Sequence, residues 1–189
     1  MGSAGTTRRS TGALAAALLA GVLAISGCGP VPGAESAPGT STPALGAAAS
    51  PPAGPAPDTL RFTGKTLEGA AFDAATLAGR PVVLWFWAPW CAACASQAWT
   101  VAEIAPGFRD SVPIIGVAGL GEQQAMKEFV TEFELEPVPQ LDDREGVLWR
   151  RFEVVEQSTF VIIDREGRVI HQGWLDGEDL TRRVTELAA

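Results

Sequence analysis

Residues 82–94 read VVLWFWAPWCAAC, an apolar run that leads into a Cys-x-x-Cys pair. The run from Pro81 to Trp87 has the length of one strand and carries no polar residue, which predicts a strand at the buried centre of a sheet. We expect a helix to begin at the cysteine pair and to continue to about Ile104. The sequence therefore predicts a buried strand that delivers two cysteines to the first turn of a helix.

This placement of the two cysteines favours thiol–disulfide exchange. Unpaired backbone N–H groups and the helix dipole stabilise a thiolate at the position of Cys91. Cys94 lies one turn later on the same face, within bonding reach. Cys91 would attack a partner disulfide to form a mixed disulfide, and Cys94 would then displace the partner. Pro89 and Trp90 would offer the incoming polypeptide a flat apolar surface.

Two other roles for the pair are weaker. The pair could be half of a zinc site, but four ligands are hard to assemble, because the sequence contains no second Cys-x-x-Cys pair and its one histidine is His171. A purely structural disulfide across so short a loop would constrain very little chain. We therefore expect no metal, flavin or nucleotide, and we expect the Cys91–Cys94 disulfide itself to be the redox centre.

The sequence after residue 57 alternates short apolar runs with charged amphipathic stretches. Strands separated by helices imply parallel pairing, and a final hairpin implies an antiparallel edge. The segment Asp142–Glu145 is expected to be a solvated turn. The pattern predicts strands at 60–62, 71–72, 81–87, 113–118, 159–163 and 168–171, and helices from the cysteine pair to 104 and at 122–134, 146–152 and 178–187.

The N-terminal residues are typical of an export signal. Arg8 and Arg9 precede an apolar run at residues 12–25, which is too short to span a bilayer comfortably. The run ends in ISGC at residues 25–28, which resembles the bacterial lipobox. That resemblance implies that Cys28 receives a diacylglyceryl group and becomes the mature N-terminus. An ordinary signal peptide with an incidental cysteine, or an uncleaved anchor, are the alternatives.

Three segments follow from these observations. Residues 1–27 are expected to be a lipoprotein signal peptide, and residues 28–57, rich in Pro, Ala and Gly, a disordered tether with no core. Residues 58–189 would form the folded domain. The protein would then be held on the outer face of the cytoplasmic membrane, in the cell envelope.

The net charge of −8 and the pI of about 4.7 argue against nucleic acid as a partner.

Residues 82–94 resemble the active-site strand and motif of thioredoxin-like proteins. The whole of 58–189 is similar to the TlpA/DsbE/redoxin branch, and residues 158–169 resemble the strand–turn–strand of that branch. Residues 83–87 resemble secreted actinobacterial members. The resemblance implies an α/β thioredoxin fold, a central mixed sheet flanked by helices with an extra N-terminal β-hairpin. It also implies an extracytoplasmic thiol–disulfide oxidoreductase that acts on exported proteins, oxidising or reducing them, together with a membrane or envelope redox partner.

The chain departs from that family near the cysteines. Ser158 stands at the position of a cis-proline, and Gln157, Ser158 and Thr159 are expected to contact the substrate. Trp85 stands where thioredoxin has a buried acid. Gln97 stands where the branch often has glutamate, so no proton acceptor for Cys94 is assigned; Glu103 is a candidate only because it is an acid on the same expected helix.

The loss of the proline leaves a second function open. The chain could be a non-catalytic, tethered thioredoxin-like module that binds a partner protein or a metal ion, with its exchange chemistry weakened by Ser158. Peroxide reduction is disfavoured, because the threonine and arginine that surround a peroxidatic cysteine in redoxins are not found.

Overall fold

The computed structural model describes residues 55–189. The signal peptide, Cys28 and nearly all of the expected tether lie outside the described residues. Among residues 55–189, none of the helices has both the length and the apolar character needed to cross a membrane. The elements are η1 (Asp58–Leu60), β1 (Thr63–Lys65), β2 (Ala71–Asp73), η2 (Ala74–Leu77), β3 (Val82–Trp87), α1 (Ala92–Phe108), β4 (Ile114–Ala118), α2 (Gln123–Glu132), β5 (Gln140–Asp142), α3 (Val147–Arg151), β6 (Thr159–Ile163), β7 (Val169–Gly173) and α4 (Gly177–Ala188).

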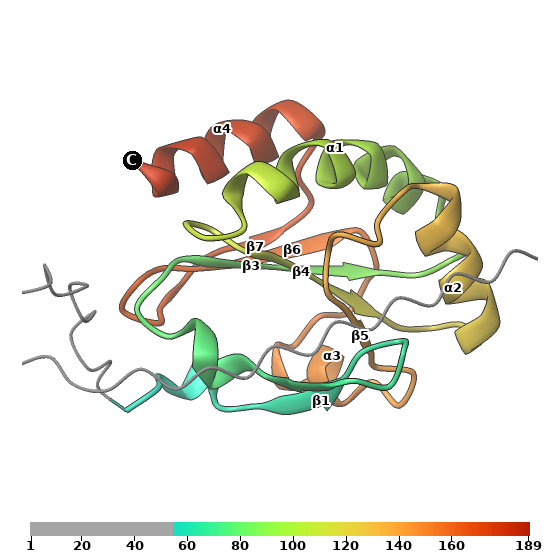
Figure 1. The fold of residues 1–189 in the computed structure, drawn as a ribbon, viewed down its shortest axis with the longest axis horizontal. Helices are drawn as coiled ribbons and strands as arrows, with labels where there is room; N and C mark the ends of the chain where they lie inside the picture. The colour runs from blue at the N-terminus through green and yellow to red at the C-terminus, as the bar shows by residue number, and fades with distance from the viewer. Residues whose placement is uncertain (1–54) are drawn as a thin grey trace, which may run out of the picture. The chain divides into compact units, whose positions relative to one another are not determined.

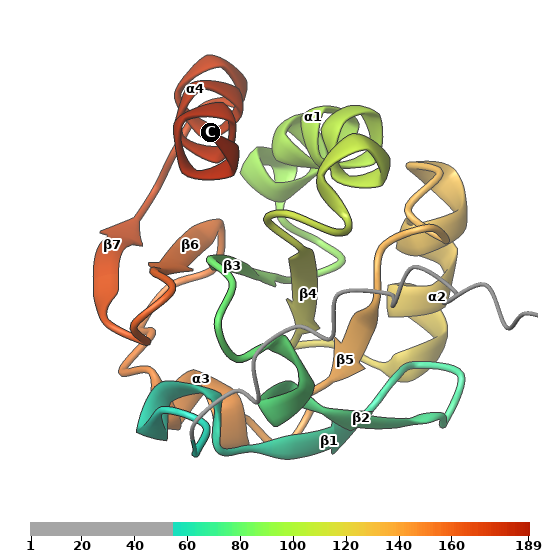
Figure 2. The ribbon, with the colours of Figure 1, turned by 60° about the vertical axis from the view of Figure 1, so that its left-hand side comes forward.

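A five-stranded mixed sheet forms the centre of this domain. Its order is β5-β4-β3-β6-β7, which Figure 2 shows across the sheet. β3 pairs in parallel with β4 and antiparallel with β6, and β6 and β7 form the antiparallel hairpin at one edge. All six residues of β3 are buried, because the strand is central and both of its faces are covered. The predicted central strand, the parallel crossover and the antiparallel edge are confirmed.

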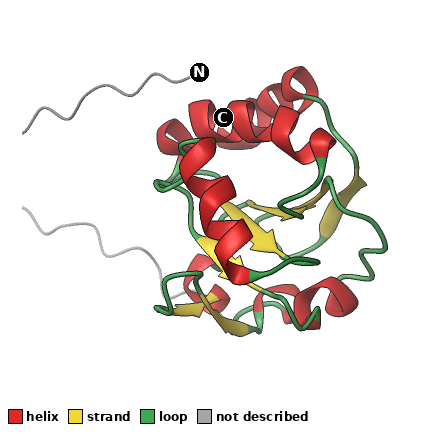
Figure 3. Ribbon diagram, turned by 90° about the vertical axis from the view of Figure 1, so that its right-hand side faces the viewer, coloured by secondary structure: helices red, strands yellow, loops and turns green. Residues whose placement is uncertain are grey.

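Two hydrophobic cores lie on opposite faces of the sheet. α1 and α4 lie side by side over one face, whereas α3 and the β1–β2 hairpin lie against the other (Figures 1 and 3). The first core contains Trp85 and Trp87 of β3 and Phe129 of α2, and the Trp87 ring stacks on both of the others. The second contains Leu84 and Phe86 from the same strand. Alternate residues of β3 therefore serve alternate faces, as the period of a strand requires.

The first predicted strand, at residues 60–62, is wrong. The chain forms a 3₁₀ turn at Asp58–Leu60, closed by a hydrogen bond of 2.9 Å from the Leu60 N–H to the Pro57 carbonyl, and the strand begins at Thr63. Leu60 and Phe62 are both buried in the second core. Two buried residues separated by one exposed residue match the period of a strand, but here the turn and the residues after it place both side chains in the core without strand pairing.

The edge strand β5 was not predicted. Pro137 and Pro139 precede it, and prolines so close together are typical of a loop. Parallel pairing with β4 makes the segment a strand, with Leu141 beside Val117. The absence of a side chain at Gly116 of β4 leaves room for the Gln140 side chain, which lies where a Cβ atom would be.

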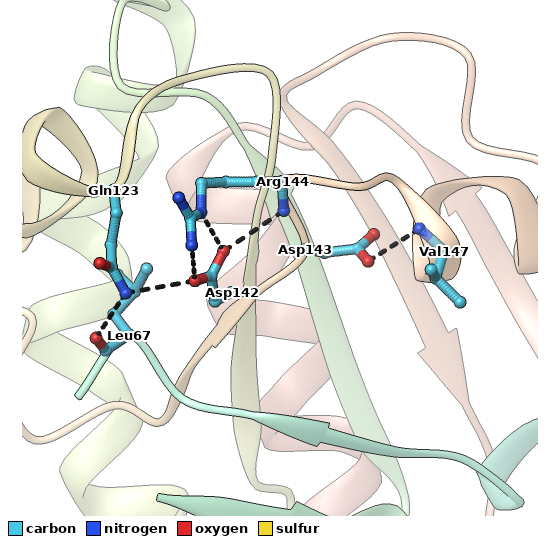
Figure 4. A network of polar contacts seen from close by, with 6 residues as sticks. All are labelled: Leu67, Gln123, Asp142, Asp143, Arg144 and Val147. Carbon is cyan, nitrogen blue, oxygen red and sulfur yellow. Dashed lines mark hydrogen bonds and ion pairs between the residues drawn. The ribbon is translucent and has the colours of Figure 1, made fainter. Parts of the chain in front are cut away.

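A polar network beyond β5 connects three parts of the domain (Figure 4). The Arg144 side chain donates to both carboxylate oxygens of Asp142, at 2.8 and 2.9 Å. Gln123, at the start of α2, donates to Asp142 and to the Leu67 carbonyl, which follows β1. Asp143 accepts from three backbone N–H groups at the start of α3 and is buried. The prediction of a solvated turn is therefore wrong for Asp143, which acts as a buried cap.

Candidate active site

Cys91 and Cys94 form a disulfide at the N-terminus of α1, with their Cα atoms 5.2 Å apart. The chain turns after β3 through a hydrogen bond of 3.2 Å from the Cys91 N–H to the Ala88 carbonyl. Cys91 is the N-cap residue of the helix, and its Sγ accepts from the Cys94 N–H at 3.1 Å. Cys91 is 6 % exposed, whereas Cys94 has no exposed surface. Of the two sulfurs, that of Cys91 is the one a partner can approach.

Cys91 is also the sulfur that the backbone favours as a thiolate. In the first turn of an α-helix the N–H groups lack carbonyl partners, and the helix dipole places partial positive charge there. The N–H group of Cys94 already points at Cys91 Sγ. A negative charge on that sulfur would therefore be stabilised.

Trp90 and Pro89 form one wall beside the disulfide. Trp90 is 61 % exposed, yet its indole is fixed by a hydrogen bond of 2.6 Å from Nε1 to the Leu120 carbonyl. The Pro89 ring lies against Gly121, where a Cβ atom would come within 2.5 Å of the ring. Next to this wall is an open groove with a volume of about 460 Å³. It is lined by Pro89, Trp90, Gly121, Glu122, Ala125, Glu128, Phe129 and Glu132.

The segment before β6 contains the other three predicted contact residues. The Ser158 N–H donates to the Phe86 carbonyl of β3 at 2.8 Å, and Ser158 has a φ of +69°. Ser158 is 5 % exposed, and its Oγ has no hydrogen-bond partner among the described residues. Thr159 is buried and donates to the Glu156 carbonyl, whereas Gln157 is half-buried. Of the three, Gln157 has the side chain most open to a substrate.

Gln97, which stands where similar proteins often have glutamate, is the polar residue that joins α1 to this segment. It is buried, three residues after Cys94, and its amide bonds to Trp85 and to the Ser158 carbonyl. The sequence carried one signal for it: a glutamine among the small apolar residues on the buried face of a helix. Glu103, an acid farther along the same helix, is exposed.

No charged side chain of residues 55–189 forms a hydrogen bond with Cys91 or Cys94. His171 lies on β7, and its pKa is lowered by burial and by the positive charge of Arg183. Within residues 55–189, no three His, Cys, Asp or Glu side chains come together as the ligands of a metal ion would. The arrangement is an apolar site with one accessible sulfur, one resolving sulfur and two fixed loops.

Comparison with known proteins agrees with this geometry. The AhpC/TSA family matches residues 53–172. The soluble secreted antigen MPT53 of Mycobacterium tuberculosis is 39 % identical over 123 residues, which are 65 % of this chain and 70 % of that protein.

Two solved structures are also similar. The DsbF protein of M. tuberculosis has a TM-score of 0.65 and 40 % identity, over 70 % of this chain and 98 % of that one. A secreted M. tuberculosis disulfide oxidoreductase has a TM-score of 0.64 and 35 % identity, over 70 % of this chain and all of that one. The expected thioredoxin-like fold is confirmed, and the chain belongs to the AhpC/TSA family.

Proposed function

We propose that this protein is an extracytoplasmic thiol–disulfide oxidoreductase that exchanges disulfides with exported proteins. The observation that carries the proposal is the Cys91–Cys94 disulfide at the N-terminus of α1, with Cys91 as its accessible sulfur. Secreted relatives at 35–39 % identity, one of them a disulfide oxidoreductase, support it.

In the oxidising direction, a client thiolate attacks Cys91 Sγ. The Cys91–Cys94 bond breaks, a mixed disulfide forms, and Cys94 leaves as a thiolate that takes up a proton. A second client thiolate then attacks the client sulfur of the mixed disulfide and releases Cys91. The client loses two electrons and gains a disulfide, and the protein becomes a dithiol. In the reducing direction the same steps run backwards, beginning with attack by the Cys91 thiolate on a client disulfide.

The client would lie across Pro89, Trp90, Gln157, Ser158 and Thr159. Pro89 and Trp90 form an apolar wall. The other three belong to the segment that is bound to β3 through the hydrogen bond from the Ser158 N–H to the Phe86 carbonyl. We propose that contact with Thr159 is through its backbone, because its side chain is buried. A client chain that passes between the wall and the segment would present its sulfur to Cys91.

We further propose that residues 1–27 are removed on export and that lipidated Cys28 anchors the protein outside the cytoplasmic membrane. The ISGC sequence at residues 25–28 supports this. Intact mass of the mature N-terminus tests it: a diacylglyceryl mass on Cys28, lost in Cys28→Ser, is expected. A mature chain that begins elsewhere or without the lipid mass would contradict the anchor.

Trapping of the mixed disulfide tests the exchange itself. The Cys94→Ser variant should accumulate a covalent complex with client proteins that reductant releases, because the resolving sulfur is missing. The Cys91→Ser variant serves as the matched control and should accumulate none. Equal exchange rates for wild type and Cys91→Ser would refute the enzyme and leave a binding module.

The midpoint potential of the couple settles the direction of electron flow. Equilibration of the purified protein in glutathione buffers gives the oxidised fraction. A potential near about −120 mV would identify a donor of disulfides, whereas one near about −270 mV would identify a reductase that needs its own electron supply.

A further inference from the structure

Gln97 forms three hydrogen bonds inside the active-site region. Its Oε1 accepts from Trp85 Nε1 at 2.8 Å, and its Nε2 donates to the carbonyl oxygens of Ser158 at 3.2 Å and Leu175 at 2.9 Å. Gln97 is 4 % exposed. One side chain of α1 therefore binds the central strand β3, the segment before β6 and the segment between β7 and α4.

Only an amide of this length satisfies all three partners. Glutamine offers an acceptor oxygen and two N–H donors, and here each is matched. The indole N–H of Trp85 can only donate, so it fixes which end of the amide faces β3. The two carbonyls can only accept, and they require both donors of the NH₂ group. An ionised glutamate has no donor, and a protonated one has a single donor.

The Ser158 segment is held from two sides as a result. Its N–H donates to the Phe86 carbonyl at 2.8 Å, and its carbonyl accepts from Gln97. Its side chain contributes nothing, since the Oγ atom has no partner among the described residues. The position of the segment beside α1 therefore depends on two backbone contacts, and Gln97 supplies one of them.

The ionisable groups of the elements around Gln97 form none of its hydrogen bonds. Glu156 precedes Ser158 and Asp176 caps α4, and both are exposed. His171 of β7 is half-buried beside Arg183 and Asp179 of α4. β3 contributes no ionisable residue. The three bonds of Gln97 therefore hold across the pH range in which thiols titrate, because none of the four groups that form them ionises there.

We propose that Gln97 is the positioning residue of the exchange site. The inference rests on the proposed function. The Gln97 amide fixes the distance between the Ser158 segment and the two cysteines, Cys91 and Cys94, so that a client backbone can bind between them. It does so without bringing a charge to the sulfurs. Gln97 does not touch the reacting atoms, so its removal should weaken client binding more than it slows the chemical step.

Gln97→Glu in the full chain is the decisive variant. The side chain keeps its size, but a carboxyl group that titrates replaces the two N–H donors of the amide. Burial raises the pKa of such a carboxyl. At pH 5 the protonated acid can still donate a hydrogen bond to one carbonyl. At pH 8 the carboxylate has no donor and repels both carbonyl oxygens. Ser96→Glu is the matched control, since it adds an exposed carboxylate one residue away on the same helix.

The measurement is KM and kcat for oxidation of a reduced, unfolded model protein between pH 5 and pH 9. The KM of Gln97→Glu should rise about tenfold relative to wild type at pH 8 and approach wild type at pH 5. Ser96→Glu should follow the wild-type profile. If Gln97→Glu follows it as well, the inference is overturned. Wild-type activity no greater than that of Cys91→Ser, both in this assay and in reduction of the oxidised model protein, would instead refute the proposed function.

A double-mutant cycle that combines Gln97→Glu with Trp85→Phe gives an independent readout that does not need catalysis. Loss of the indole N–H in Trp85→Phe leaves the Gln97 amide free to rotate by 180°, and Gln97→Glu removes the amide donors. Each single substitution should therefore shift the midpoint potential or the unfolding midpoint. The double variant should cost clearly less than the sum of the two, because both act on one network. Additive effects would mean that Trp85 does not orient Gln97, and would overturn the inference.

Discussion

Ser158→Pro is the sharpest test of the backbone beside the disulfide. The resemblance drawn from the sequence places a proline at this position, and on that ground alone the substitution would be expected to stabilise the site. The structure predicts the opposite. The Ser158 N–H donates to the Phe86 carbonyl, and the residue has a φ of +69°, whereas proline has no N–H and holds φ near −65°.

The expected cost follows from these two conflicts. Leaving the buried Phe86 carbonyl without its donor costs about 1–3 kcal/mol. The segment must also leave its left-handed conformation, which adds to that cost. A total on the order of 2–4 kcal/mol corresponds to a fall in Tm of roughly 5–15 °C for a domain of this size.

Thermal unfolding of the oxidised protein, followed by circular dichroism, measures this fall. Ser158→Ala is the matched control, because it keeps the N–H and removes an Oγ that has no partner. It should leave Tm unchanged or slightly raised. Ser158→Gly, which removes the strain of a positive φ, should raise stability by about 1 kcal/mol. A Tm for Ser158→Pro equal to or above wild type would show that Phe86 does not hold this segment as described.

Three further outcomes are expected. Trp90→Phe keeps an apolar wall but loses the hydrogen bond to Leu120, so the KM for a protein client should rise a few-fold with kcat little changed, by steady-state kinetics. Glu128 and Glu132 line the groove beside Trp90, so wild type should prefer basic over acidic client peptides at low salt, and 0.5 M NaCl should abolish that preference because exposed charges are screened. Glu128→Gln with Glu132→Gln should remove most of the same preference, measured by steady-state kinetics. The hydrogen bond from Arg144 lowers the pKa of Asp142, so this pair stabilises the fold above about pH 4 and the effect is lost as the pH falls through the native pKa. Arg144→Met should therefore lower the urea midpoint at pH 7 more than at pH 3.

The features that were predicted correctly are those with a strong local signal. The apolar run of β3 has no other plausible place than the centre of a sheet, and a cysteine pair after it marks the helix start. The parallel pairing of β3 with β4 followed from the helix between them. Each of these features depends on neighbours in sequence, which is why one chain suffices to find it.

The features that were missed depend on distant partners. β5 is a strand because β4 lies beside it, and its own residues give no such signal. Asp143 looked like a solvated acid, but the N–H groups at the start of α3 draw it inward. Gln97 could be noticed as a buried glutamine, but its partners Ser158 and Leu175 lie 61 and 78 residues away. Such bonds become visible only when the chain is folded.

The end of β3 connects all the parts of the proposed site. The indole of Trp85 orients Gln97, the Phe86 carbonyl holds Ser158, and the Trp87 carbonyl accepts from the Gly119 N–H at 3.0 Å, just before the loop that fixes Trp90. Three successive residues of one buried strand thus position the three segments around Cys91. Substitutions within β3 should therefore disturb client binding through more than one loop, whereas substitutions in a single loop should disturb one contact. The division of roles is then clear: the strand supplies position, and the helix terminus supplies the electrostatic stabilisation that the thiolate needs.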